Sequence, residues 1–492
     1  MNLLEKLKNR INNRNDISGN KQIVQLTYFF SLLFVVLIAY IAIIVYRDSD
    51  AIINNSYNKR ESIYANKTVR GSILSEDGEI LAYTELSTNE EKRIYPYGKI
   101  FAHVVGYNSK GKAGIENSAN FLLLKSNILF TDRIKNELSG KKNPGDSVVT
   151  TLDLNSQFAA YQALNERNGA VILMDADNGY ILAMVSKPDF DPNDIDLNWD
   201  YLVNEKGNAS LLNKVTQGLY PPGSTFKILT ALEYLKENTD VSDYEFDCPG
   251  YFEYKGNRIN CYHGVAHGTV NFDQSFAKSC NASFANITTK LKKKGFRDTC
   301  ESLLFNEKMP SPLIINNRSS FWVKDSFVPI NSKSPIDELM QTGIGQGKTE
   351  ISPYHMCLIS SAIANDGILM NPIIVKEIET AAGDHVTSCS VRPYKRLLSS
   401  EDSAKVRELM RGVITEGTGS VLYNTSGYEA YGKTGSAEFS SNKTESHAWF
   451  TGFAVGDNGR TVAISVIVEN GGSGGQVAAP VARAVFDAYF NK

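Results

Sequence analysis

"LYPPGSTFKILTALEYL", the stretch from Leu219 to Leu235, joins an abrupt break to a helical pattern. Two prolines and a glycine disfavour a helix before Ser224, and the apolar residues after it recur on one helical face. We therefore expect Ser224 at a helix N-terminus, where the helix dipole favours negative charge. Residues three apart on a helix are neighbours, so Lys227 is expected within reach of the Ser224 hydroxyl.

A serine followed three residues later by a lysine is weak evidence by itself, because this spacing occurs seven times in the chain. An isolated match is typical of a serine N-cap beside a solvated lysine. The chemical alternative is a nucleophile and its base, since a serine hydroxyl reacts well only when a base takes its proton. Lys227 can be that base if burial or a nearby cation lowers its pKa enough to leave the amine neutral.

Two further motifs follow Ser224 and favour the chemical alternative. "AKSCNASFA" contains Ser279 and Asn281 in a Ser-x-Asn arrangement. "AYGKTGSAEF" contains the only Lys-Thr-Gly of the chain, beginning at Lys433 on an expected strand. The glycine of that motif suits close approach of a ligand to the strand. Taken singly, Ser279 is typical of a helix cap and Lys433 is typical of an edge strand. Three motifs in this order, however, predict one catalytic site.

The composition indicates a globular protein of more than one domain. The chain has 492 residues, of which 42% are hydrophobic and 21% charged. Its formal net charge is −3 and it has no long basic run, which argues against nucleic acid as a partner.

The N-terminal region contains a long apolar segment. No charged residue occurs between Lys21 and Arg47, which is enough length to span a bilayer core. A buried core helix rarely runs so long without a polar face, and the run exceeds the apolar part of a cleaved signal peptide. We expect a retained transmembrane anchor at 22–47 in the cell membrane, with a basic cytoplasmic tail at 1–21 and the rest of the chain outside the cytoplasm.

Two regions of different pattern follow the anchor. Residues 48–147 contain short strand-like pieces, with a hairpin turn at "EDGE", and are expected to form a small mixed domain that lifts the rest from the membrane. Residues 148–492 begin with a helix-like stretch, "SQFAAYQAL", and two strand-like runs joined by "DADNG". Helical stretches follow, then further strands, and an amphipathic segment, "APVARAVFDAYF", comes last. Strands at both ends predict one sheet built from sequence-distant parts, in an α+β domain.

The six cysteines leave three interpretations open. Cys248 and Cys261 flank a polar, turn-rich segment that a disulfide could close; together with His263 and His267 they could instead hold a zinc ion. The spacing fits no standard zinc pattern well, so free thiols and no metal site are the favoured interpretation. The other cysteines are interpreted as buried fillers: Cys280, Cys300, Cys357 and Cys389.

One glycine-rich stretch, "ENGGSGGQVAAPVA", invites comparison with a phosphate-binding loop. It lacks the Gly-Lys-Ser/Thr ending of such loops and follows the last expected strand. We therefore expect a loop beside the active-site cleft, and no cofactor.

The three motifs in this order resemble those of the class B penicillin-binding proteins, the anchored D,D-transpeptidases of bacterial cell-wall synthesis. The second motif has Cys280 where the usual version has aspartate. Two other stretches are also similar to the family, "NKRESIYANKTVRGSILSEDGEILA" and "TGIGQGKTEISPYHMCLISSAIANDG". The resemblance implies a pedestal or dimerisation-like domain at 48–147 and, at 148–492, a transpeptidase domain with an antiparallel sheet flanked by helices, as in serine β-lactamases.

The resemblance also implies acyl transfer from a peptidoglycan stem peptide ending in D-Ala-D-Ala. Ser224 would attack the penultimate carbonyl while Lys227 accepts its proton. Ser279, helped by Lys433, would relay a proton to the leaving D-alanine, and Asn281 would orient the donor peptide and hold the base. The third motif would bind the donor's terminal carboxylate and complete the oxyanion hole begun by the backbone N–H of Ser224. Its substrate-binding residues are Thr434, Gly435 and Ser436.

Several alternatives share these motifs or this layout. A β-lactamase or a β-lactam sensor has the same three motifs, but the pedestal-like region and the retained anchor favour a synthetic enzyme. A D,D-carboxypeptidase would use water as the acceptor, and a non-catalytic scaffold would only recruit other wall-synthesis proteins. The family resemblance further implies β-lactams as covalent inhibitors. Since no polymerase domain is recognised, it also implies a polytopic membrane glycosyltransferase as partner.

Overall fold

The computed structural model describes most of the 492-residue chain. Contacts divide the chain into two units, Met1–Arg60 and Glu61–Lys492, which are described separately. The described ranges are 21–53, 59–87, 90–205, 207–238, 240–315, 318–319, 321–438 and 445–491.

The N-terminal unit contains a long helix, α2 (Lys21–Ile53). Its segment Ile23–Val45 has a mean hydropathy of 2.8, and none of its most apolar window is buried. At 1.5 Å per residue these 23 residues extend roughly 34 Å, enough to cross the hydrocarbon core of a bilayer. Among the described residues there is thus one N-terminal apolar helix of the kind found in membrane anchors and signal sequences. The expected tail before Lys21 lies outside the described residues.

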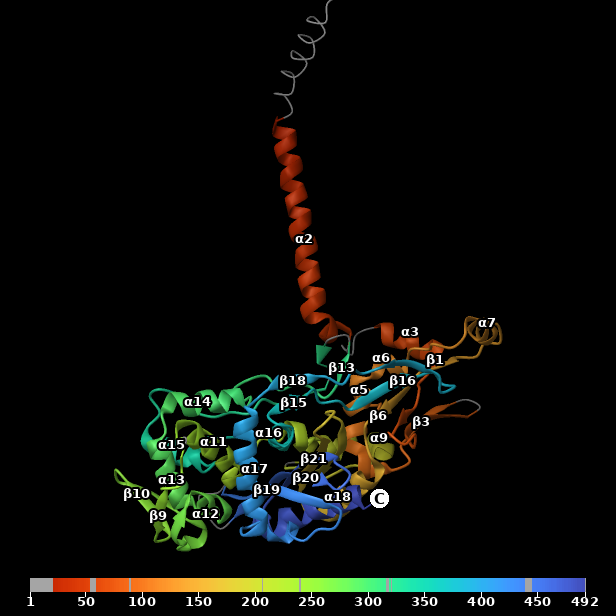
Figure 1. The fold of residues 1–492 in the computed structure, drawn as a ribbon. Helices are drawn as coiled ribbons and strands as arrows, with labels where there is room; N and C mark the ends of the chain where they lie inside the picture. Colours follow the sequence, from red (N-terminus) through yellow and green to blue (C-terminus); the bar gives the residue numbers. More distant parts are fainter. Residues whose placement is uncertain are drawn as a thin grey trace, which may run out of the picture. The chain divides into compact units, whose positions relative to one another are not determined.

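The centre of the larger unit is a five-stranded antiparallel sheet in the order β19-β20-β21-β7-β8 (Figure 1). β7 and β8 form the hairpin predicted around "DADNG", and β19 to β21 come from the C-terminal region. The prediction of one sheet built from both ends of this region is therefore confirmed. The strands are β7 (Gly169–Asp175), β8 (Ile181–Lys187), β19 (Tyr428–Glu438), β20 (Ser446–Gly456) and β21 (Thr461–Val468).

Helices cover both faces of this sheet because its central strands are apolar on both sides. In β21, Val462, Ile464 and Val466 belong to one core cluster, whereas Ala463 and Ile467 belong to another. The first cluster includes residues of α8 and α18, and the second includes residues of α16, which lies on the opposite side (Figure 1). These helices are α8 (Leu154–Leu164), α16 (Pro353–Ala364) and α18 (Ala479–Phe490).

A helical lobe packs beside β19 and is built around phenylalanines. Phe226, Phe272, Phe276 and Phe284 are almost fully buried in its core. Their packing fixes the relative positions of the helices that follow Ser224 and those that flank Ser279. The helices of the lobe are α11 (Lys227–Glu237), α12 (Phe272–Ala277), α13 (Asn281–Lys290), α14 (Lys293–Ser302), α15 (Ile336–Gly343) and α17 (Ser400–Thr415).

The pedestal region contains a six-stranded sheet in the order β17-β16-β6-β2-β3-β4. β2 and β3 are antiparallel, so the hairpin predicted at "EDGE" is present. β6 crosses the predicted domain boundary between 147 and 148, and β16 and β17 lie beyond that boundary in sequence. The pedestal sheet is thus completed by residues of the following domain. Its strands are β2 (Ile73–Leu74), β3 (Ile80–Leu86), β4 (Glu91–Ile94), β6 (Ser147–Thr150), β16 (Val375–Glu379) and β17 (His385–Ser388).

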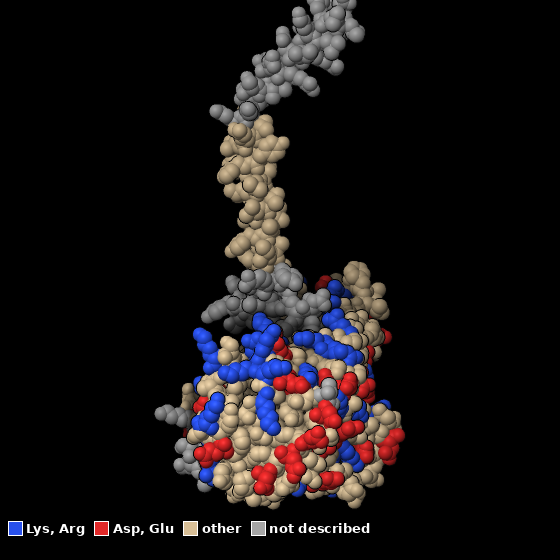
Figure 2. Space-filling model, turned by 60° about the vertical axis from the view of Figure 1, so that its left-hand side comes forward, with Lys and Arg blue, Asp and Glu red and all other residues tan. Residues whose placement is uncertain are grey.

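One face of the larger unit carries charge of both signs. Figure 2 shows most of the Lys and Arg of this face in its upper part and most of the Asp and Glu lower down, with some acidic residues directly beside basic ones. The charges on this face are therefore only partly segregated.

Candidate active site

Ser224 lies in a 3-10 turn, Gly223–Phe226, that leads directly into α11. The sequence predicted the N-terminus of an α-helix at Ser224, so the regular helix begins one turn later than expected. The turn is held from both sides. Gly223, at φ 55°, donates its N–H to the carbonyl of Gly345 at 2.8 Å, and the indole of Trp449 donates to the carbonyl of Pro221 at 3.1 Å.

Lys227 brings its amine to the Ser224 hydroxyl, with Nζ 3.0 Å from Oγ. The same amine lies 2.7 Å from Asn281 Oδ1 and 2.7 Å from the backbone carbonyl of Ser279. The side chain is completely buried. Burial lowers the pKa of Lys227 to about 8, because the charged ammonium loses its hydration. A lysine with such a pKa is available as a base near neutral pH.

Ser279 occupies the sharp turn between α12 and α13, with a φ of 58°. This left-handed conformation is uncommon for a residue with a side chain, and it costs energy that the surroundings must offset. The turn is tied back by the N–H groups of Ser279 and Cys280, which donate to the carbonyls of Phe276 and Ser275. The N-cap of α13 is Cys280 rather than Ser279, which leaves the Ser279 hydroxyl free to point toward the lysines.

Lys433 reaches the same hydroxyl from β19, with Nζ 2.9 Å from Ser279 Oγ. Its side chain is also fully buried. Burial and the nearby Lys227 amine lower the pKa of Lys433 well below its ordinary value. The two buried amines lie on either side of the Ser279 hydroxyl, and two ammonium groups so close together would repel each other. One amine therefore stays neutral, and a proton can pass between the two amines through the hydroxyl.

The third motif lies against the Ser224 turn. A Cβ at Gly435 would stand only 3.1 Å from the carbonyl of Pro222, so glycine permits this close approach. Thr434 shares a hydrogen bond of 2.5 Å with Thr418, and Ser436 Oγ accepts from the N–H of Gly474 at 3.3 Å.

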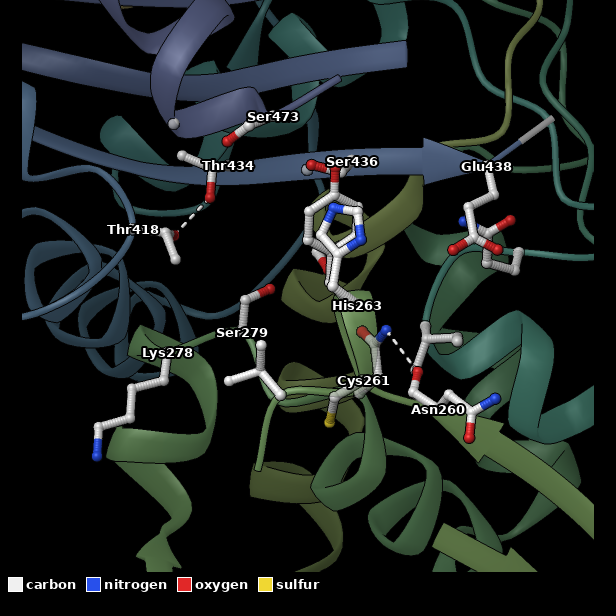
Figure 3. A pocket seen from close by; sticks show the side chains of 18 of the residues that line it. Asn260, Cys261, His263, Lys278, Ser279, Thr418, Thr434, Ser436, Glu438 and Ser473 are labelled. Carbon is white, nitrogen blue, oxygen red and sulfur yellow. Dashed lines mark hydrogen bonds between the residues drawn. The ribbon is translucent and has the colours of Figure 1, made fainter. Parts of the chain in front are cut away.

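These residues surround a cavity of about 840 Å³ (Figure 3). Lys227 and Lys433 lie buried behind its wall, in contact with the lining serines. The loop predicted beside the cleft contributes Ser473, Gly475 and Gln476. The predicted site residues that line the cavity are Ser224, Ser279, Asn281, Thr434, Gly435 and Ser436.

Several lining residues were not predicted from the sequence. Thr418 lies beside Thr434, to which it is hydrogen-bonded (Figure 3), and its only sequence signal is a position between two glycines after α17. Gln346 belongs to the Gly-Gln-Gly stretch noted for its family resemblance, but its place beside the site was not expected. His263 and Glu438 also lie on this wall (Figure 3).

The cysteines differ from expectation at one position. Cys248 and Cys261 are free thiols whose sulfurs lie 3.6 Å apart, so no disulfide joins them. Cys280 was interpreted as a buried filler; it is buried, and its sulfur also lies 3.4 Å from that of Cys248. The histidine near these sulfurs is His267, with Nδ1 3.5 Å from Cys248 Sγ, and not His263.

Two family models match the chain. The penicillin-binding protein transpeptidase domain matches residues 169–487, which contain all three motifs. The penicillin-binding protein A dimerisation domain matches residues 70–148, the pedestal region.

Relatives with assigned functions match over most of the chain. Peptidoglycan D,D-transpeptidase PbpA of Mycobacterium tuberculosis is 28% identical over 452 residues, covering 85% of this chain and 88% of the relative. Peptidoglycan D,D-transpeptidase MrdA of Acinetobacter baumannii is 29% identical over 463 residues, covering 80% of this chain and 65% of the relative.

Solved structures agree with the fold. Penicillin-binding protein A from M. tuberculosis, as its ceftriaxone acyl-enzyme complex, matches with a TM-score of 0.77 and 26% identity, covering 87% of this chain and 99% of that one. The D,D-transpeptidase domain of a peptidoglycan glycosyltransferase from Eggerthella lenta matches with a TM-score of 0.76 and 26% identity, covering 86% and 99%. The chain therefore belongs to the penicillin-binding proteins, as a class B peptidoglycan D,D-transpeptidase.

Proposed function

We propose that this transpeptidase forms its acyl-enzyme on Ser224, with Lys227 as the general base. The observation that carries the assignment is the 3.0 Å contact between Lys227 Nζ and Ser224 Oγ, made by a buried amine of lowered pKa. As Ser224 Oγ attacks the carbonyl of the penultimate D-alanine, its proton moves to Lys227. The carbonyl oxygen becomes an oxyanion, held by the backbone N–H groups of Ser224 and Ser436.

In the second half of acylation, the leaving D-alanine nitrogen receives a proton. The C–N bond of the tetrahedral intermediate breaks, and the departing nitrogen of the terminal D-alanine takes a proton from Ser279 Oγ. Lys433 lies 2.9 Å from that oxygen and Lys227 3.3 Å, so the hydroxyl can be reprotonated from either amine. An amine of a second stem peptide then attacks the acyl-Ser224 ester and gives a proton to Lys227. The ester C–O bond breaks, Lys227 returns the proton to Ser224 Oγ, and the new amide bond is the cross-link.

The third motif is proposed to bind the donor's terminal carboxylate. Thr434 and Ser436 line the cavity with hydroxyl groups, and Thr418 is hydrogen-bonded to the first of them. An incoming carboxylate would favour the charged form of Lys433, because an opposite charge raises the pKa of a buried amine. Gly435 keeps the strand close to the Ser224 turn, and Asn281 holds the base through its 2.7 Å contact.

We place the catalytic unit on the outer side of the cell membrane. The apolar segment Ile23–Val45 would act as a single-pass anchor, and the basic residues before it favour a cytoplasmic N-terminus. Stem peptides are cross-linked outside the cytoplasm, so this orientation brings enzyme and substrate together. A polytopic membrane glycosyltransferase that polymerises the glycan is the proposed partner, on the basis of the family resemblance. Co-purification from membranes that repeatedly fails to recover such a partner would contradict this part.

The nucleophile is tested by labelling the full-length protein in detergent with fluorescent penicillin, beside a Ser224→Ala variant. We expect a covalent label that persists for hours and is absent from the variant, with both proteins showing the same unfolding temperature. Label retained by the variant would contradict the assignment. Rapid loss of label, with hydrolysed drug accumulating, would indicate a β-lactamase, and a folded wild-type protein that never labels would indicate a scaffold.

The acceptor is tested with a synthetic stem peptide ending in D-Ala-D-Ala and an excess of a fluorescent D-amino acid. A transpeptidase exchanges the terminal D-alanine for the fluorescent amine. Release of D-alanine without incorporation of the fluorescent amine would instead identify water as the acceptor and the enzyme as a D,D-carboxypeptidase.

A further inference from the structure

One helix of the pedestal region, α7 (Phe130–Leu138), turns its apolar face away from the protein. Phe130, Ile134 and Leu138 recur every four residues, so they form one stripe along the helix. All three side chains are exposed, Leu138 by 85%, and Leu129 just before the helix is exposed as well. Surface helices of globular proteins place such a stripe against the core, so the orientation of α7 is inverted.

The polar side of α7 is the side that faces the protein. Of its nine residues, all of which the structure describes, only Asn136 is not exposed. The Asn136 side chain donates from Nδ2 to Asn143 Oδ1 at 3.1 Å. Two residues correspond to roughly 200° around a helix, so Asn136 stands opposite Ile134 and Leu138. This hydrogen bond therefore holds α7 with its apolar stripe outward, where the helix stands out from the pedestal region (Figure 1).

The strand after α7 ties the helix to the first strand of the pedestal. β5 (Asn143–Pro144) pairs in parallel with β1 (Thr68–Val69). Lys142, which precedes β5, donates from Nζ to the carbonyl of Ala65 at 2.7 Å, three residues before β1. The stripe thus belongs to the part of the larger unit that comes first after the N-terminal helix.

The length of the chain keeps this part of the pedestal near the bilayer. Residues 46–60, 15 in number, separate the apolar segment Ile23–Val45 from Glu61, where the larger unit begins. Even fully extended, this link reaches at most roughly 55 Å. A membrane that holds the anchor is therefore within reach of the elements around β1.

The chain around α7 is basic, although the protein as a whole is not. Residues 125–142 contain five basic residues and two acidic ones, whereas the formal net charge of the whole chain is −3. Arg133 and Lys135 are exposed and flank the apolar stripe on its two sides. Basic side chains beside an apolar stripe are typical of helices that lie in the interface of an anionic bilayer.

We propose that α7 is an interfacial helix, which inserts its apolar stripe into the lipid bilayer beside the anchor. The name of the matched pedestal family suggests a second copy of the chain as the alternative occupant. Stable protein interfaces use about 20–30 residues per partner, however, and this stripe has four apolar side chains. A lipid surface needs no complementary shape, so a narrow stripe is sufficient.

The contact would restrict how the catalytic unit moves above the membrane. A unit attached only through residues 46–60 tilts freely about that link. A second contact at α7 limits the tilt and holds the cavity around Ser224 within a narrow range of heights above the bilayer. This inference rests on the proposed anchor and not on the proposed catalytic roles.

The contact is tested with Phe130→Trp in the full-length protein, reconstituted in vesicles of phosphatidylcholine and phosphatidylglycerol. Bromine on the acyl chains quenches only a tryptophan that reaches them. An interfacial helix lies about 5–10 Å deep, so bromine should reduce the emission of the added tryptophan by roughly half or more. The emission of the wild-type protein, with its three tryptophans, is subtracted.

The matched control is Tyr254→Trp, which changes an exposed aromatic residue of β10 (Tyr251–Tyr254). β10 lies at the opposite end of the larger unit from α7 (Figure 1), so its added emission should not be quenched. Absence of quenching in Phe130→Trp would overturn the proposal. A blue shift that bromine does not quench would also overturn it, and would identify a second copy as the occupant.

The lipid charge and the stripe are tested separately. Quenching should weaken in vesicles of phosphatidylcholine alone, and equal quenching there would overturn the part assigned to the basic residues. In the Phe130→Trp protein, Leu138→Asp should abolish quenching, whereas Leu197→Asp, at an equally exposed leucine outside α7, should not. Equal effects of the two changes would overturn the assignment of the stripe. Both variants should label with penicillin in detergent at the wild-type rate.

The restriction of tilt is tested by energy transfer from fluorescent penicillin on Ser224 to an acceptor dye in the lipid headgroups. Leu138→Asp should broaden the distribution of donor lifetimes, and an unchanged distribution would overturn the restriction. Protein that is quenched at Phe130→Trp but never labels would contradict the Ser224 assignment and leave the membrane contact intact. Protein that labels but is not quenched would do the reverse.

Discussion

Lys227 combines full burial with contacts to four oxygen atoms from Ser224, Ser279 and Asn281. Its pKa of about 8 makes the ammonium the main form below that pH and the free amine the main form above it. The proposed role of Lys227 as general base requires the free amine, so the rate of acylation should rise with pH and level off above about 8.

The pH prediction is checked by the second-order rate of penicillin labelling between pH 6.5 and 9.5. A rate that is flat or falls over this range would contradict the assignment of Lys227 as base. In Lys227→Arg the guanidinium stays protonated throughout, so the rate should drop by roughly 100-fold or more and lose this pH dependence.

A second buried ionic group lies in the pedestal. The carboxylate of Glu116 is fully buried and accepts from Arg70 Nε at 2.6 Å and Arg93 Nε at 2.7 Å. Burial alone would raise the pKa of Glu116, but the two guanidinium groups outweigh it and hold the pKa below its usual range. The resulting stability is present above the ordinary glutamate pKa and is lost as the pH falls through the lower, folded-state pKa.

Glu116→Gln should lower the free energy of unfolding by about 3–5 kcal/mol, because two buried cations lose their partner. The matched control is Glu91→Gln, which removes a 2.6 Å pair with Lys142 between side chains that are one third exposed. That change should cost no more than about 1 kcal/mol. Urea unfolding of both variants at pH 7 measures the difference, and equal effects would contradict the prediction.

The candidate catalytic residues could be proposed from the sequence because their chemistry imposes local spacing. A serine and a lysine three positions apart meet on any helical turn, and the motif around Lys433 is unique in the chain. Thr418 was not predictable, because a threonine between glycines has many ordinary uses and its partner Thr434 is brought to it only by folding. The cysteine group was missed for a similar reason: its members come from three loops and a helix, so no fixed spacing marks them.

At the scale of single elements, the hairpins were the easiest features to predict. The turn residues of "EDGE" and "DADNG" predict the β2–β3 and β7–β8 pairs, and the antiparallel pairing of these strands confirms both hairpins. The 3-10 turn around Ser224 was not predicted. It arises from a contact with the distant Gly345, which the local sequence does not contain.

Gly345→Ala should disrupt this turn. Its φ is 72°, and a Cβ would stand 2.0 Å from the carbonyl oxygen of Gly223, so the chain before Ser224 has to move. We expect the rate of penicillin labelling to fall by roughly 100-fold, as is usual when a nucleophile is displaced by about an ångström. The control is Gly383→Ala, which has a φ of 89° but open space around the new methyl group. If Gly383→Ala loses activity to the same extent, the loss in Gly345→Ala is due to backbone strain and not to the clash with Gly223.

At the scale of the whole larger unit, the pedestal and the transpeptidase region share a sheet. β16, from the middle of the transpeptidase sequence, pairs with β6 at the end of the pedestal sequence. The sequence indicated two regions by their change of pattern, but a change of pattern does not reveal a strand that crosses between them. The predicted boundary between 147 and 148 consequently falls inside β6.

This shared sheet predicts how the chain tolerates truncation. A chain beginning at Gly169 would match the transpeptidase family region but would leave the edge of β16 unpaired, and unpaired edges promote aggregation. We expect it to be recovered mainly as aggregate, whereas a chain beginning at Glu61 should be soluble. Size-exclusion chromatography of both chains checks this, and a monodisperse short chain would contradict it.

The indole that steadies the Ser224 turn has a spectroscopic consequence. The protein has three tryptophans, and Trp449 is the one whose Nε1 donates to the carbonyl of Pro221, three residues before Ser224. It is fully buried, whereas Trp322 is largely exposed. Replacing Trp199 and Trp322 with phenylalanine would leave a single native fluorophore whose emission responds to movement of the turn. Stopped-flow fluorescence could then follow acylation by unlabelled antibiotics in real time, without a dye on the drug.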